Sequence, residues 1–221
     1  MSLRNAYELV EHFTDLHEIH EKVVGVNMSG ELTEQELIFR YIREDAKVLE
    51  LGGNIGRSSI VISKILQKPH HHVVLESDPE IANELMQNKK ANKCGFQIVN
   101  AALSEKPMIQ NGWTTQLHEH NRIIPHGWKA IPTITLQQLQ TLHPISFDTL
   151  VVDCEGCLEP ILKAYPFFLD KIHTIVIEND AQFISQESNN FIDSFIRKKG
   201  FRNVECRQLE QYPCFYQVWL R

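Results

Sequence analysis

The sequence predicts an α/β protein with a mostly parallel β-sheet, helices on both of its faces and an antiparallel pair of strands at its C-terminal edge. Three observations predict this class. From residue 46 onward, short apolar runs alternate with longer helical stretches, which is typical of parallel strands joined by helices. Two β-type runs close the chain. Before residue 46, apolar residues recur at helical spacing, so residues 1–45 are expected to form a helical flank or lid.

The expected elements can be given in chain order. In the flank, Thr33 and Glu36 have the spacing of a capping box, which marks the start of a helix. Strands are expected at about 47–51, 72–76, 96–99, 147–153 and 172–178, and helices near 55–67, 79–93, 136–142, 156–164 and 187–199. The two final runs, 201–207 and 215–220, are joined by a stretch with Pro213 and predict the antiparallel edge pair.

Residues 104–133 interrupt this alternation of strands and helices. They contain several prolines and glycines together with Trp113 and Trp128, which predicts an irregular insertion or β-arm over the strand ends. The two tryptophans either stack on a bound molecule or form a local core for the arm. Because no internal repeat or shift of composition marks a second unit, residues 46–221 are expected to form one domain that includes this insertion.

Composition excludes several classes of protein. The chain has 221 residues, 43% of them hydrophobic, which is enough for one sizeable core and argues against disorder. There are 22 basic and 28 acidic residues, a net charge of −6, so no nucleic-acid partner is expected. No long apolar run or secretory signal is present, so we expect a cytoplasmic protein with no membrane contact.

The five cysteines form an odd set in a chain that is too long to need disulfides, and reduced thiols are expected. Cys154 and Cys157 have the C-x-x-C spacing, for which a redox or zinc role is the alternative. Zinc would require a second such pair or nearby histidines, and neither lies close in the sequence.

The loop after the first predicted strand indicates a nucleotide-like ligand. Glycines allow a sharp turn and close approach of the backbone, and the following helix start offers free N–H groups. A dinucleotide fingerprint fails here, because Asn54 and Arg57 stand where it requires glycine. An acidic residue at a strand end would repel a pyrophosphate and therefore favours a cationic ligand. The candidate binding residues of this segment are Glu50, Gly52, Gly53, Asn54, Gly56 and Ser59.

The next two strand ends complete the expected cofactor site. Glu76 follows the second strand, where a carboxylate can accept hydrogen bonds from both ribose hydroxyls, and Ser77 stands beside it. Asp78 is expected to cap the helix that starts at Pro79. After the third strand, Asn100 and Ala101 would lie beside an adenine.

The spacing acidic-x-Gly-x-x-x-Gly, from Glu50 to Gly56, resembles the first motif of class I S-adenosylmethionine methyltransferases. Further segments occur in the order found in the FkbM-type family: 52–56, 76–79, 100–104, 135–136, 153–156 and 175–178. This resemblance covers about 46–180. It implies a Rossmann-like fold, S-adenosylmethionine as methyl donor, and transfer mostly to hydroxyl oxygens of sugars, polyketides or related small metabolites.

Asp153 and Glu155, at the end of the fourth strand, are the candidate catalytic residues. In-line methyl transfer requires alignment and removal of the hydroxyl proton, for which a carboxylate can serve as base. Alternatively, Glu155 merely caps the next helix. A magnesium ion held by Asp153 with 178–179 would also activate a hydroxyl, as in magnesium-dependent O-methyltransferases. The histidines that could act as the base instead are His118, His120, His126 and His173.

Other functions remain possible on this sequence. An RNA or protein methyltransferase would share the donor site, but the D/N-P-P-Y motif of amino methyltransferases is absent around Asp153. A non-catalytic cofactor-binding module would also retain the glycine loop. An NAD-dependent dehydrogenase is disfavoured by the glycine spacing. A small-molecule acceptor is therefore the expected partner.

Overall fold

A seven-stranded sheet forms the centre of the computed structural model, which describes residues 31–119, 121–180, 184–208 and 214–221. The strand order is β11-β12-β10-β9-β1-β2-β3. In chain order the strands are β1 (Val48–Leu51), β2 (His72–Leu75), β3 (Gln97–Val99), β9 (Thr149–Val152), β10 (Thr174–Asp180), β11 (Arg202–Gln208) and β12 (Cys214–Leu220). The first five run parallel, whereas β12 pairs antiparallel with both β10 and β11. The predicted sheet and its C-terminal edge pair are confirmed.

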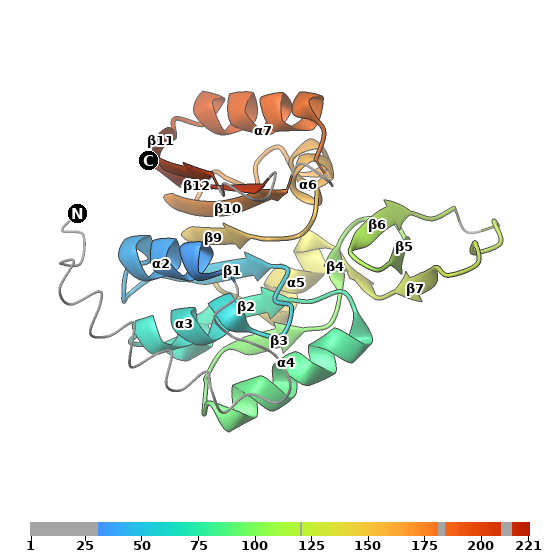
Figure 1. The fold of residues 1–221 in the computed structure, drawn as a ribbon, viewed down its shortest axis with the longest axis horizontal. Coiled ribbons are helices and arrows are strands. Elements are labelled where there is room, and N and C mark those ends of the chain that lie inside the picture. Colours follow the sequence, from blue (N-terminus) through green and yellow to red (C-terminus); the bar gives the residue numbers. More distant parts are fainter. Residues whose placement is uncertain (1–30, 120, 181–183, 209–213) are drawn as a thin grey trace.

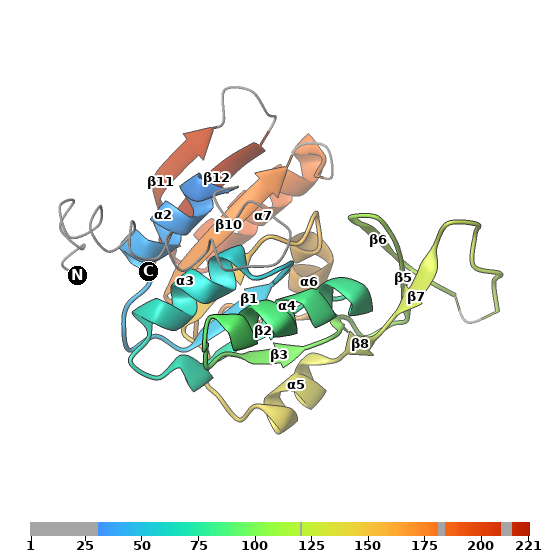
Figure 2. The same cartoon turned by 60° about the horizontal axis from the view of Figure 1, so that its bottom comes forward.

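Helices cover both faces of the sheet (Figures 1 and 2). The helices are α2 (Leu32–Tyr41), α3 (Arg57–Ile65), α4 (Pro79–Ala91), α5 (Leu136–Leu142), α6 (Leu158–Ala164) and α7 (Gln186–Lys198), with a 3-10 turn at Pro69–His71. Apolar side chains of α2, α3 and α4 pack on one face, and those of α5, α6 and α7 pack on the other. Strands β1, β2, β9, β10 and β12 contribute to the cores on both faces because their side chains alternate between the faces.

The alternation along β1 and β9 decides where the polar strand ends point. Leu49 and Leu51 of β1 belong to the core under α5, α6 and α7, whereas Val48 belongs to the core under α2 and α3. In β9, Val152 faces the first of these cores and Val151 the second. A carboxylate two residues after a strand residue therefore lies on that residue's face of the sheet.

Helix α2 starts differently from the prediction. It begins at Leu32, and the preceding Glu31 has φ 59° and makes no side-chain capping bond. The capping box expected at Thr33 and Glu36 is therefore wrong. Helix α2 packs into the core with β1, α3 and β12. Any helix of the predicted flank before Glu31 lies outside the described residues, and the division at residue 46 stays a prediction.

The predicted insertion contains a small antiparallel sheet. Its strands, in the order β6-β5-β7, are β5 (Met108–Asn111), β6 (Thr114–Leu117) and β7 (Lys129–Ile131). A two-stranded parallel pair, β4 (Ala102–Leu103) and β8 (Thr133–Ile134), connects this arm to the main domain. The arm extends from the side of the domain where the parallel strands end (Figure 1). No helix among the described residues is both long and apolar enough to cross a membrane.

Candidate active site

The glycine loop between β1 and α3 is held tightly against two strands. The backbone N–H groups of Gly52 and Gly53 both donate to the Leu75 carbonyl, at 2.9 and 3.0 Å. Gly52 has φ 89°, and a Cβ added there would lie 1.6 Å from the backbone oxygen of Asp153. A side chain is therefore excluded at Gly52. The close contact also makes the end of β9 a direct neighbour of the loop.

Glu50 and Ser59 lie beneath this loop in the core. The Glu50 carboxylate is 1% exposed, accepts a hydrogen bond from Ser59 Oγ at 2.8 Å, and lies 2.7 Å from His72 Nε2. These contacts tie β1 to α3 and to the start of β2. Both residues support the base of the loop, and their predicted contact with a cofactor stays a prediction.

Glu76 links the loop to the end of β2. One carboxylate oxygen accepts the Asn54 N–H at 2.8 Å, and the other accepts the Asp78 N–H at 2.8 Å. Burial raises the pKa of Glu76. A carboxylate has about four acceptor sites, so each oxygen retains capacity for a hydroxyl donor. The Asn100 side chain donates to the Glu76 carbonyl at 2.8 Å and holds this strand end in place.

The remaining predicted donor-site residues lie around these two strand ends. Gly56, with φ 100°, is the residue immediately before α3, and Ala101 is buried after β3. Ser77 donates to Gln110 of the arm at 2.9 Å. Asp78 caps α4 as predicted, accepting the Glu80 N–H at 2.9 Å. Its other oxygen lies 2.7 Å from Lys129 Nζ, so the arm is attached beside the expected ribose site.

A second polar group gathers at the end of β9. Asp153 lies on the α2 face of the sheet, like Val151, and one carboxylate oxygen each from Asp153, Glu31 and Glu34 lie within 4.8 Å of one another. Glu31 is paired with Arg57 at 2.9 Å. Oxygen ligands at this spacing suit a hard divalent cation.

Like charges dominate the electrostatics of this acidic cluster, defined as Glu31, Glu34 and Asp153. Burial, then the nearby Glu178, raises the pKa of both Asp153 and Glu34 well above the ordinary range. Ser58 Oγ donates to one oxygen of Glu34. The other oxygen of Glu34 is buried and has no hydrogen-bond partner in the part of the chain that the structure describes. The acidic cluster therefore favours the binding of a proton or a cation.

Glu155 follows Asp153 in an unusual turn. Its φ is 51° and that of Gly156 is 93°, so two consecutive residues are left-handed. Burial, with repulsion from Asp180, Glu178 and Glu31, raises the pKa of Glu155 to about 7. Helix α6 begins later, and Cys157 immediately before it makes no side-chain capping bond. The alternative in which Glu155 only caps this helix is therefore wrong.

The structure brings together only part of the predicted magnesium set, because Glu178 is close enough to Asp153 to raise its pKa whereas Asn179 lies elsewhere. Asn179 lies on the α7 side, where its amide donates to Gln217 at 3.3 Å and it lines a cavity with Ile192. Asp153 instead meets Glu31 and Glu34 of the opposite face. The sequence analysis did not single out these two glutamates. One signal for Glu34 was available, because it falls on the apolar face of α2 with Leu37, Ile38 and Tyr41.

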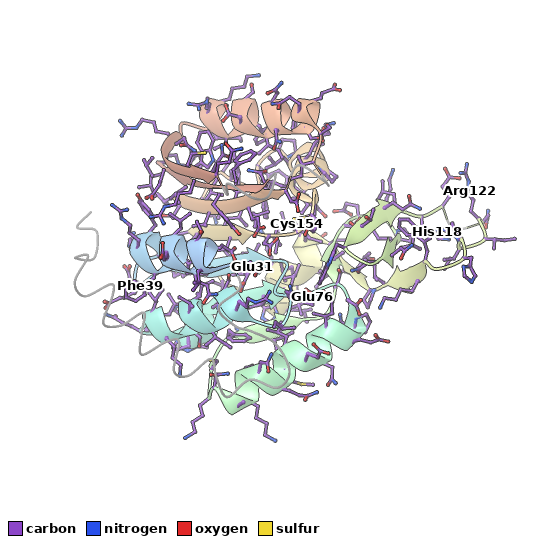
Figure 3. All side chains as sticks on the ribbon, viewed as in Figure 1. Glu31, Phe39, Glu76, His118, Arg122 and Cys154 are labelled. Carbon is purple, nitrogen blue, oxygen red and sulfur yellow. A yellow bond between two sulfur atoms is a disulfide. The ribbon has the colours of Figure 1, made fainter. Side chains whose placement is uncertain are left out.

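The three candidate histidine bases that the structure describes are not at this site. Figure 3 shows His118 out on the arm, well separated from Cys154 and Glu31 at the strand ends. His126 is exposed in the loop that follows the arm's first two strands, and His120 lies outside the described residues. His173 immediately precedes β10 and so stands at the opposite end of the sheet. Trp113 of the arm is 49% exposed and Trp128 is half-buried.

The cysteine prediction needs a correction. Cys154 and Cys157 are joined in a disulfide, with their Cα atoms 5.5 Å apart. Reduced thiols are expected from the sequence because the chain is long enough to fold without cross-links. This disulfide, however, closes a local turn and does not link segments that are distant in the sequence. Cys94 and Cys206 are free.

Several solved structures with folds similar to this chain are described as methyltransferases. A precorrin-6y C5,15-methyltransferase from Geobacter metallireducens has a TM-score of 0.53 and 14% identity, covering 86% of each chain. A putative O-methyltransferase from Klebsiella pneumoniae has a TM-score of 0.53 and 15% identity, covering 96% of this chain and 90% of that one. Aeropyrum pernix fibrillarin, in complex with S-adenosyl-L-methionine, has a TM-score of 0.53 and 10% identity, covering 86% of this chain and 74% of that one. No family model and no curated protein matches the chain. At these identities the likeness shows the fold alone, and it confirms the predicted Rossmann-like methyltransferase architecture.

Proposed function

We propose that this protein is an S-adenosylmethionine-dependent methyltransferase that acts on a hydroxyl oxygen of a small molecule. The resemblance of its motifs to the FkbM-type family supports a sugar, a polyketide or a related metabolite as the acceptor. The observation that carries the proposal is the direct contact between Gly52 and the backbone of Asp153. A donor site on the glycine loop and a set of carboxylates suited to proton transfer are thereby neighbours.

The residues around the loop fit the donor. When bound, S-adenosylmethionine supplies an electrophilic methyl group on a sulfonium. Glu76 retains acceptor sites for the two ribose hydroxyls, and Gly52 lets the loop pack directly against the end of β9. The carboxylates beyond β9 favour a cationic ligand over a phosphate. This last feature also argues against a dinucleotide.

Glu155 is the proposed general base. A carboxyl with a pKa of about 7 is half ionised near neutrality and so matches the pH at which it must accept a proton. In this role, the Glu155 carboxylate accepts the proton of the acceptor hydroxyl when the hydroxyl oxygen attacks the methyl group of the donor. Asp153, with its high pKa, is the proposed partner that orients the hydroxyl.

RNA and protein acceptors are the less favoured alternatives. A nucleic-acid backbone would approach a chain of net charge −6 whose acidic cluster stands at the catalytic end of the sheet. A non-catalytic cofactor-binding module would bind the donor and never turn over. Such a module would be distinguished from the proposed enzyme by donor binding without the formation of any methylated product.

Calorimetric titration with S-adenosylmethionine and S-adenosylhomocysteine tests the donor. The wild type is expected to bind both, and Glu76→Ala is expected to lose most of this affinity, with NAD as the control ligand. A panel of hydroxylated acceptors with labelled donor, in the presence and absence of magnesium, then tests transfer. Absence of donor binding, or a preference for NAD, would refute the proposal.

A further inference from the structure

The turn that carries Glu155 is held in an unfavourable conformation. Glu155 is a non-glycine residue in the left-handed region, which costs free energy unless the surroundings impose it. Its carboxylate also faces repulsion from Asp180, Glu178 and Glu31. Both effects push this segment toward a different backbone conformation, so something must hold it.

The bond between Cys154 and Cys157 spans this turn. It joins the residues on either side of Glu155 and Gly156, and the Cys157 N–H donates to the Cys154 carbonyl at 3.2 Å across the same turn. Both sulfur-bearing residues pack against the core beneath α6 and α7. The cross-link therefore anchors the turn at both ends.

The turn is also connected to the glycine loop. A Cβ on Gly52 would lie 3.3 Å from Cys154 Cα, so these two backbones are in close contact. A rearrangement between Asp153 and Cys157 would change one wall of the loop. Cys154 and Cys157 are both half-buried, so a small thiol reagent can reach them.

We propose that Cys154 and Cys157 form a reversible dithiol–disulfide pair whose oxidation fixes Glu155 in the candidate active site. The oxidant is a low-molecular-weight disulfide such as glutathione disulfide. One cysteine thiolate attacks it, forming a mixed disulfide and releasing one thiol. The second cysteine thiolate then attacks the protein sulfur, forming the internal bond and releasing a second thiol. Two electrons pass from the protein to the oxidant, and its two sulfurs take up the two protons.

The first measurement is thiol content. Wild type and Cys206→Ser, a control that keeps the pair, are reduced and then equilibrated in glutathione buffers of graded ratio, alkylated and mapped by mass spectrometry. Oxidation is expected to remove both alkylation sites at Cys154 and Cys157 together, with no glutathione attached. Cys154→Ser is expected to carry a stable glutathione adduct on Cys157. A pair that stays alkylated at every ratio, or that takes up glutathione in the wild type, would overturn the proposal.

The second measurement is hydrogen exchange of the peptide that covers Asp153 to Cys157. Reduction is expected to speed exchange there by about fivefold or more, while the arm is unaffected. Equal exchange in both states would overturn the proposed fixing of Glu155. The link to methyl transfer rests on the proposed function, and donor titration of both redox states reports on it separately. If neither state binds the donor, the proposed function fails, while thiol content and exchange still decide this inference.

Discussion

The two ends of the candidate active site differ in how their carboxylates are satisfied. On the donor side, Glu76 accepts two backbone N–H groups and Glu50 is held by Ser59 and His72. On the β9 side, Glu34 has a buried oxygen without a partner among the described residues, and Asp153 faces other carboxylates. Hydrogen bonds therefore fix the positions of the carboxylates on the donor side, Glu50 and Glu76.

We infer from this difference that the two ends of the candidate site have different roles. A carboxylate that is held by several hydrogen bonds has a fixed position, which suits the recognition of hydroxyl groups. Burial and repulsion raise the pKa of the carboxylates at the β9 end, that of Glu155 to about 7, which suits proton transfer. Substitutions at the two ends are therefore expected to separate ligand binding from proton transfer.

The largest effect is expected from Gly52→Ala. Its Cβ would lie 1.6 Å from the Asp153 oxygen at φ 89°, so the loop must shift, costing about 3 kcal/mol of stability and abolishing donor binding. Gly112→Ala is the matched control, because Gly112 also has positive φ but nothing lies within 4 Å of its added Cβ. It should lose only about 1 kcal/mol and bind normally. Chemical denaturation and calorimetry compare the two, and normal binding by Gly52→Ala would remove the loop from the donor site.

Glu155→Gln is expected to affect rate and leave binding intact. Loss of the general base should slow methyl transfer by about 100-fold or more. The wild-type rate should rise as the pH increases through about 7, because only the ionised carboxylate accepts a proton. The variant should lack this rise while donor titration stays unchanged. A full rate with the same pH profile would exclude Glu155 as the base.

The fold could be predicted because its elements leave local signals. The buried strands Val48–Leu51 and Thr149–Val152 are mostly apolar, and Asp78 before Pro79 is a helix start that the structure confirms. The start of α2 could not be predicted in the same way. There, tertiary packing selects Leu32 over the capping sequence that begins at Thr33.

The residues of the proposed donor side could be grouped from the sequence, because they directly follow predicted strands. The acidic cluster could not, because Glu34 and Asp153 are distant in sequence and meet only when α2 packs beside β9 and β10. The disulfide was missed for a different reason. It spans two consecutive left-handed residues, Glu155 and Gly156, and residue spacing alone does not reveal that conformation.

Glu34→Gln is expected to stabilise the protein at neutral pH. Because the folded-state pKa of Glu34 is raised, mainly by burial, folding loses stability as the pH rises above the unfolded value of about 4.5. Glutamine does not titrate and can still accept the Ser58 hydrogen bond. The variant should gain about 1 kcal/mol at pH 7.5 and nothing near pH 4, measured by urea denaturation. Glu84→Gln, on the exposed face of α4, is the control, and an equal gain there would contradict the burial argument.

The smallest effect is expected where the arm meets the donor side. Lys129→Met removes the ion pair with Asp78, whose members are 43% and 11% exposed, and should cost about 0.5 kcal/mol. Burial raises the pKa of Asp78, but the bond from Lys129 and the Glu80 N–H together hold it below its ordinary value. The cost should therefore begin to shrink as the pH falls below the ordinary aspartate value of about 3.8, and it should disappear once the pH has passed the lowered pKa of Asp78. Lys106→Met, on the exposed start of the arm, should show no such pH dependence. If donor affinity also falls in Lys129→Met alone, the arm contributes to the rigidity of the donor side, and the contrast between the two ends extends beyond the strand ends themselves.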